Sequence, residues 1–150
     1  MAYLQTKPYV LEGDAGTVVL GPGLRVSAKA TSLQTGGGFN LLEVAAPAGA
    51  ASPLHIHYAE DVAVFVLEGS LTVFWGDEGK AVPAGSTLYI PRGTPHGFRV
   101  PHPDGVRVLY VTVPGGFDGF AQEHDSWTEA TACIAAAARY KIEILGPLPE

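Results

Sequence analysis

Short runs of alternating or β-branched residues, separated by glycine- and proline-rich breaks, limit what this chain can fold into more than any other feature. Successive side chains of a strand point to opposite faces, so such runs predict short strands with one face in a core. The 19 glycines and 12 prolines supply breaks that accept turn geometry at little steric cost. The pattern predicts an all-β sandwich or barrel. The runs are residues 17–20, 24–30, 39–45, 54–57, 62–68, 71–75, 87–90, 96–100 and 106–113.

The pattern changes after Pro114. Ser126-Trp127-Thr128-Glu129 has the form of a capping box, and the alanine-rich stretch that follows, to Arg139, favours helix. Residues 142–147 have the character of a short extended tail. We therefore expect a single domain over residues 1–150, with the barrel at about 17–114 and a helical cap and tail at 117–150. A chain of 150 residues is large enough to bury a core of its own.

Charge and hydropathy exclude two classes of partner. The formal net charge is -6, and the scattered lysines and arginines form no basic patch for a phosphate backbone. No apolar run approaches the roughly 18 residues that a membrane span needs, and residues 1–8 lack the pattern of a secretory leader. Cys133 is the single cysteine, so no intrachain disulfide can form. We expect a cytoplasmic protein that binds neither nucleic acid nor membrane.

Two of the five histidines, His55 and His57, are spaced so that both rings project from one face of a strand. Imidazole suits divalent iron, nickel, manganese, copper and zinc, so the pair indicates a class of metal and leaves its identity open. Gly85, Pro91 and Gly93 predict tight turns on either side of a strand over residues 87–90, which aim His96 inward as a third ligand. The alternative is that the three histidines are ordinary polar residues at a barrel mouth. His102 and His124 lie in polar loops, and we expect them at the surface.

The spacing of these residues resembles the paired signature of the cupin superfamily. That resemblance implies a double-stranded β-helix, the cupin or jelly-roll barrel, with a short C-terminal α-helix. It also implies that His55, His57 and His96 converge on one interior point and hold one divalent transition metal. The residues that carry it are Gly49, His55, His57, Gly69, Gly85, Pro91, Gly93 and His96.

The chain departs from the cupin pattern at one ligand. A cupin usually has a glutamate seven residues before the closing glycine, and here that position is Val62, which can neither bind a metal nor move a proton. Glu60 is one candidate to swing in and replace the carboxylate as a catalytic group. An exposed hairpin is the commoner place for an acidic pair, so we expect Glu60 and Asp61 in solvent. Tyr58 is a second catalytic candidate, as a proton donor or substrate contact, with a packing role at the rim as the alternative.

Further segments are similar to the bacterial quercetin 2,3-dioxygenase-like branch of the cupins. This resemblance implies a homodimer that binds a flat, oxygen-rich aromatic substrate, with oxidative ring cleavage as the reaction. The absence of the glutamate leaves two alternatives open: a redox-neutral cyclase or isomerase of aromatic polyketides, and a non-catalytic module that binds small molecules. The segments are residues 28–31, 34–39, 53–55, 113–117 and 138–147.

Overall fold

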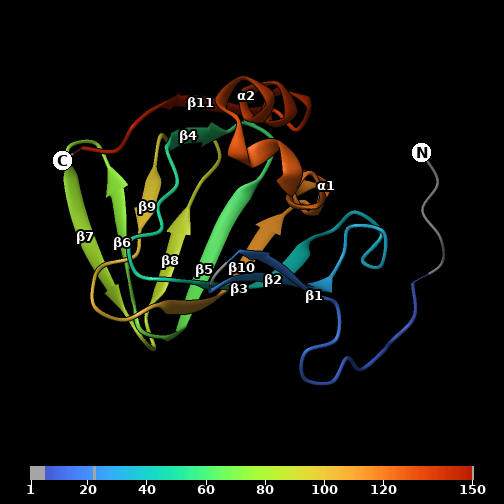
Figure 1. The fold of residues 1–150 in the computed structure, drawn as a ribbon. Helices are drawn as coiled ribbons and strands as arrows, with labels where there is room; N and C mark the ends of the chain where they lie inside the picture. Colours follow the sequence, from blue (N-terminus) through green and yellow to red (C-terminus); the bar gives the residue numbers. More distant parts are fainter. Residues whose placement is uncertain (1–5, 22, 150) are drawn as a thin grey trace.

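The computed structural model describes residues 6–21 and 23–149, and its main feature is a curved six-stranded antiparallel sheet (Figure 1). The strand order is β1-β2-β3-β10-β5-β8, so the two central strands, β3 and β10, come from distant parts of the sequence. The bounds are β1 (Thr17–Gly21), β2 (Leu24–Ala30), β3 (Asn40–Ala46), β10 (Val106–Val113), β5 (Asp61–Glu68) and β8 (Thr87–Ile90).

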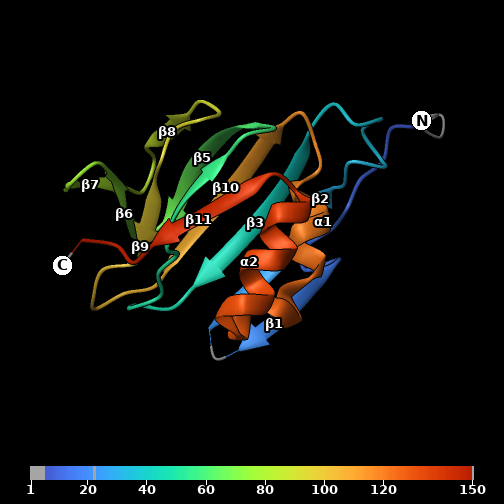
Figure 2. The same cartoon turned by 90° about the horizontal axis from the view of Figure 1, so that it is seen from above.

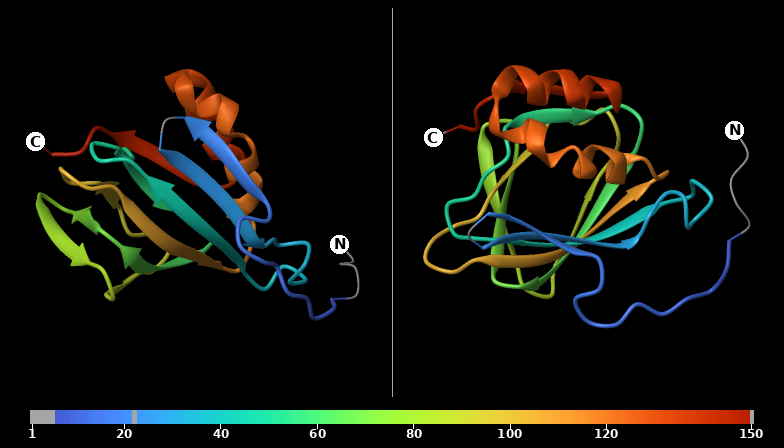
Figure 3. Two further views of the ribbon diagram at one scale, coloured as in Figure 1. Left: turned by 60° about the horizontal axis from the view of Figure 1, so that its bottom comes forward. Right: turned by 45° about the vertical axis from the view of Figure 1, so that its right-hand side comes forward.

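Two smaller antiparallel sheets complete the wall opposite the large sheet and close the barrel (Figure 3). One has the order β7-β6-β9, and the other pairs β11 with β4. The all-β double-stranded β-helix predicted from the sequence is therefore the observed fold. The bounds are β7 (Glu78–Pro83), β6 (Ser70–Trp75), β9 (Gly97–Arg99), β11 (Ile142–Gly146) and β4 (Leu54–His57).

The barrel core follows from strict alternation on two neighbouring inner strands, β5 and β10. On β5, Val62, Val64 and Val66 are 1%, 3% and 0% exposed, whereas the residues between them face outward. Their partners on β10 are Thr112, Tyr110 and Val108, which are buried as well. Fully burying a valine contributes about 1.5–3 kcal/mol, so this single row accounts for a substantial share of the stability of a small domain.

The C-terminal segment forms a helical cap over one end of the barrel (Figure 1). It consists of α1 (Phe117–Gln122), the 3-10 helix η1 (His124–Thr128) and α2 (Ala130–Arg139). Helix α2 packs against β11, which starts beside the end of the helix (Figure 2), and a second small core forms beneath the helices. Glu129, not Ser126, is the N-cap of α2, and its carboxylate accepts hydrogen bonds from the backbone N–H groups of Thr131 and Ala132. The expected capping box is therefore wrong, because residues 124–128 form a helical turn of their own.

One strand lies outside the predicted runs, and the expected extended tail gains a partner strand. Residues 78–83 form β7, an edge strand whose side chains are exposed except for Val82. An exposed edge strand carries no apolar alternation to reveal it. The tail at residues 142–147 contains β11, which pairs Ile142 with His57 and Ile144 with His55.

No helix within the described ranges of the chain has both the length and the hydrophobicity needed to cross a bilayer.

Candidate metal centre

Three imidazole rings meet inside the barrel where β4 lies beside the start of β9. Strand alternation puts His55 and His57 on one face of β4, and His55 forms a reciprocal backbone pair with His96. The ring centroid of His55 lies 5.0 Å from that of His57 and 4.4 Å from that of His96. One nitrogen from each ring lies within 4.8 Å of the other two. The structure therefore brings together the three histidines that the sequence singled out.

The Nδ1 atom of each ring is already engaged. His55 Nδ1 lies 2.7 Å from the Pro53 carbonyl oxygen, and His96 Nδ1 lies 2.9 Å from the Thr94 carbonyl oxygen. A carbonyl oxygen only accepts, so Nδ1 must carry the proton and donate in both rings. His57 Nδ1 lies 2.6 Å from Glu60 Oε1. These bonds leave Nε2 of all three rings as the nitrogen with a free lone pair.

Two of these Nε2 atoms, on His57 and His96, are buried without a hydrogen-bond partner in the part of the chain that the structure describes. An unsatisfied buried polar atom costs about 1–3 kcal/mol, and such atoms in a cluster call for a partner. Burial, followed by the neighbouring His96 ring, lowers the pKa of His55 to about 3, and burial lowers the pKa of His96 to about 4. Neutral rings with free Nε2 lone pairs are the form in which histidine binds metals, so the donor set fits one divalent ion.

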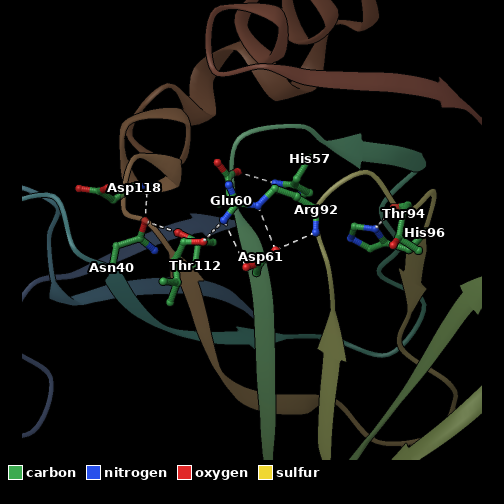
Figure 4. A network of polar contacts seen from close by, with 10 residues as sticks. Asn40, His57, Glu60, Asp61, Arg92, Thr94, His96, Thr112 and Asp118 are labelled. Atoms are coloured by element: carbon green, nitrogen blue, oxygen red, sulfur yellow. Dashed lines mark hydrogen bonds and ion pairs between the residues drawn. The ribbon is translucent and has the colours of Figure 1, made fainter.

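Glu60 is buried, at 3% exposed, and its carboxylate points at His57 (Figure 4). The expectation of a solvated side chain is therefore wrong for Glu60, because the turn between β4 and β5 folds it inward. Its bond is to Nδ1, on the side of the ring away from Nε2, and Glu60 is not part of the cluster of candidate ligand atoms. Asp61 is half-buried and forms an ion pair with Arg92 at 3.1 Å.

Tyr58 lies outside the site. Its side chain is 52% exposed, and its hydroxyl donates to Glu143 Oε1 at 2.7 Å. The structure thus places Tyr58 on the outer surface, bonded to β11, and does not bring it to the histidines. Val62 is 1% exposed and belongs to the core cluster, so an apolar side chain occupies the position of the usual carboxylate. His102 is exposed and His124 is partly exposed.

An apolar cavity of about 390 Å³ adjoins the histidines. His55 and His57 are part of its wall, and the described lining residues include no Asp, Glu, Lys or Arg. Its size is within the range of ordinary small-molecule sites. Sequence reasoning missed two of its members, Tyr110 and Phe117. Alternation over residues 106–113 places Tyr110 inward, but nothing in the sequence indicates that the space in front of it is left unfilled. Other apolar lining residues are Leu42, Val64, Leu71, Val108, Phe120 and Ile144.

The Phe117 ring lies between the site and Tyr110. Its centroid is 5.4 Å from that of His57 and 5.1 Å from that of Tyr110. Burial, and second the Glu60 carboxylate, raise the pKa of Tyr110, so its phenol is neutral at physiological pH. A neutral phenol donates a hydrogen bond, and no bond to this hydroxyl is found among the described residues. Tyr110 is thus the available O–H donor that sequence reasoning overlooked.

Comparisons with known proteins agree with this geometry. A profile of the cupin domain family matches residues 42–112. Over 93 residues the chain is 30% identical to a quercetin 2,3-dioxygenase of Bacillus subtilis, covering 62% of this chain but only 28% of that protein. Over 95 residues it is 30% identical to an uncharacterized protein of Methanocaldococcus jannaschii, covering 63% of this chain and 69% of that one. The crystal structure of an RmlC-like cupin from Shewanella frigidimarina matches with a TM-score of 0.64 and 20% identity, covering 77% of this chain and 99% of that one.

Proposed function

The chain belongs to the cupin superfamily, and from that premise we propose that it is a metal-dependent enzyme acting on a flat, oxygen-rich aromatic molecule. The observation that carries the proposal is the pair of buried Nε2 atoms, on His57 and His96, without a partner among the described residues beside an apolar cavity. With His55 they form a three-nitrogen set suited to iron, nickel, manganese, copper or zinc. The leading reaction is dioxygen addition, as the name of the Bacillus subtilis relative suggests.

A divalent ion on these histidines would act as a Lewis acid that polarises an enol or phenol oxygen. The residues of the chain bind and orient the rest of the molecule. Burying about 200 Å² of ring surface against the apolar walls contributes ~5 kcal/mol before the costs of association. The same walls keep water from the reacting oxygen. Tyr110 donates a hydrogen bond to a second oxygen of the substrate.

The cavity offers no strong base. Its described lining contains no carboxylate, and Val62 stands where one is usual. A positioned general base contributes on the order of 10²–10⁴-fold, so a substrate that needs deprotonation would react poorly. This supports a substrate whose hydroxyl is already acidic, such as a flavonol or a polyketide-like enol.

The missing base favours a second candidate function, retention of a small ligand without turnover, which makes no demand for a carboxylate in the cavity. A redox-neutral cyclisation or isomerisation of an acidic aromatic polyketide at the same site is the other alternative. Oxygen uptake separates these outcomes from dioxygen addition, because only the dioxygenase consumes it.

The test begins with metal content. Purified wild-type protein should contain close to one transition ion per chain, and His57→Ala should lose most of it. His102→Ala should retain it, since His102 is exposed and does not belong to the cluster of His55, His57 and His96. An oxygen electrode with a flavonol then measures turnover by the metal-loaded protein. Metal content unaffected by His55→Ala, His57→Ala and His96→Ala alike would refute the site.

A further inference from the structure

We infer that Glu60 is a positioning residue that fixes the His57 ring and supplies the negative charge of the site from one residue away, in place of a carboxylate on the metal itself. This inference rests on the proposed function, because it assumes that the three histidines bind a metal. It assigns to Glu60 a role different from that of ligand or base.

The burial of Glu60 needs an explanation. A carboxylate removed from water is costly unless it is paired and hydrogen-bonded. Glu60 is 3% exposed, and His57 is its hydrogen-bond partner among the described residues. The neighbouring acid, Asp61, instead makes its bonds to Arg92 near the surface. Two adjacent carboxylates therefore have separate partners, and the buried one is dedicated to a candidate ligand.

His57 differs from the other two histidines in what holds it. His55 and His96 donate Nδ1–H to neutral backbone carbonyls, whereas His57 donates to a carboxylate at 2.6 Å. Hydrogen bonds to an ionised group are shorter and about twice as strong as neutral ones. Such a bond fixes the tautomer and the ring orientation, and it raises the basicity of the opposite nitrogen. His57 Nε2 is thus the strongest nitrogen donor of the three.

The burial of Glu60 compensates for the negative charge that is missing at Val62. Three neutral imidazoles bring no negative charge to a divalent ion in an apolar barrel, and the described cavity wall adds none. Glu60 is a buried carboxyl group hydrogen-bonded to a candidate ligand. Because it lies on the Nδ1 side of the ring and outside the cluster of candidate ligand atoms, it occupies no position on the metal. The arrangement keeps the charge of a cupin carboxylate while leaving its coordination position available to substrate oxygens.

The experiment compares Glu60→Gln with a matched control, Asp61→Asn, which removes the adjacent carboxylate. The dissociation constant for Zn²⁺ is measured by competition with a chromophoric chelator. Loss of a carboxylate behind a ligating histidine typically weakens metal binding 10- to 100-fold, and we expect that loss in Glu60→Gln. Asp61→Asn should bind Zn²⁺ within threefold of wild type. The visible spectrum of bound Co²⁺ should shift in Glu60→Gln and stay unchanged in Asp61→Asn.

A second measurement uses the wild-type protein without metal and does not depend on how the variants fold. Long-range ¹H–¹⁵N correlation spectra should show His57 protonated on Nδ1, with a proton resonance further downfield than those of His55 and His96. A different tautomer of His57, or Zn²⁺ affinity in Glu60→Gln equal to wild type, would overturn the inference while leaving the metal site intact. Wild-type protein that binds no transition metal would overturn the proposed function, and the role of Glu60 with it.

Discussion

Replacing Val62 with glutamate tests whether the position of the usual cupin carboxylate still faces the histidines. Val62 is 1% exposed in the barrel core, and Val64, on the same face of β5, lines the cavity. Losing the buried valine costs about 1.5–3 kcal/mol. Burying the new carboxyl group adds a second free-energy cost. This cost is limited because the group can take up a proton, and raising its pKa from about 4.3 to 7 corresponds to ~4 kcal/mol. Metal-free Val62→Glu should therefore be less stable than wild type by about 6 kcal/mol, a large part of the stability of a domain this size.

Metal should reverse much of that loss. A carboxylate that reaches the ion becomes paired, and every tenfold gain in affinity adds about 1.4 kcal/mol to the stability of the loaded protein. The assay is urea denaturation of wild type, Val62→Glu and Val62→Gln, each with and without saturating Zn²⁺. Glutamine matches the size of glutamate without its charge. We expect the stabilisation by Zn²⁺ to be largest in Val62→Glu by several kcal/mol. Equal stabilisation of the two variants would mean that residue 62 does not face the histidines.

Three further predictions follow from other parts of the structure. The folded pKa values of His55 (about 3) and His96 (about 4) lie below the ordinary 6.5, so below pH 6.5 the unfolded chain binds more protons than the folded one. The unfolding free energy of the metal-free protein should therefore fall as pH drops below 6.5, by up to about 1.4 kcal/mol per pH unit for each histidine. A flat urea-denaturation profile between pH 6.5 and pH 4 would contradict this. Tyr110→Phe should leave the melting temperature unchanged and weaken flavonol binding about threefold to tenfold, measured by isothermal titration calorimetry; unchanged affinity would remove Tyr110 from the binding site. A Cβ at Gly69 would lie 2.1 Å from the Gly105 carbonyl oxygen, whereas one at Gly76, with a similar positive φ, meets nothing within 4 Å. Gly69→Ala should therefore lower the urea midpoint more than Gly76→Ala does. Equal shifts in the two variants would exclude the clash.

The strands were predictable because their burial has the period of the sequence pattern. Residues 24–30, 54–57, 87–90 and 106–113 form β2, β4, β8 and β10 with the expected bounds. Buried and more exposed positions alternate along β8 and β10, and this pattern is local information. The meeting of His55 with His96 depended on the family resemblance, since a pairing between residues so far apart has no local signature.

The parts that escaped prediction are those determined by long-range packing. The local sequence around Glu60 is that of a polar turn, and its burial depends on where His57 stands after the barrel closes. The cavity is the space that side chains from distant strands leave unfilled, so no single run of residues records it. Edge strand β7 is polar because it faces water, which removes the signal that identified the other strands.

The pairing of β4 with β11 has a consequence for the order in which the site is assembled. Both structural neighbours of the strand that carries His55 and His57 come later in the sequence: the segment at His96, and β11 at residues 142–146. A ribosome synthesises β4 long before either neighbour, so the nascent chain exposes two histidines on an unpaired segment. The third ring and β11 arrive afterwards, so tight binding of an ion at the proposed site would have to wait until residue 146 has emerged and the barrel has closed.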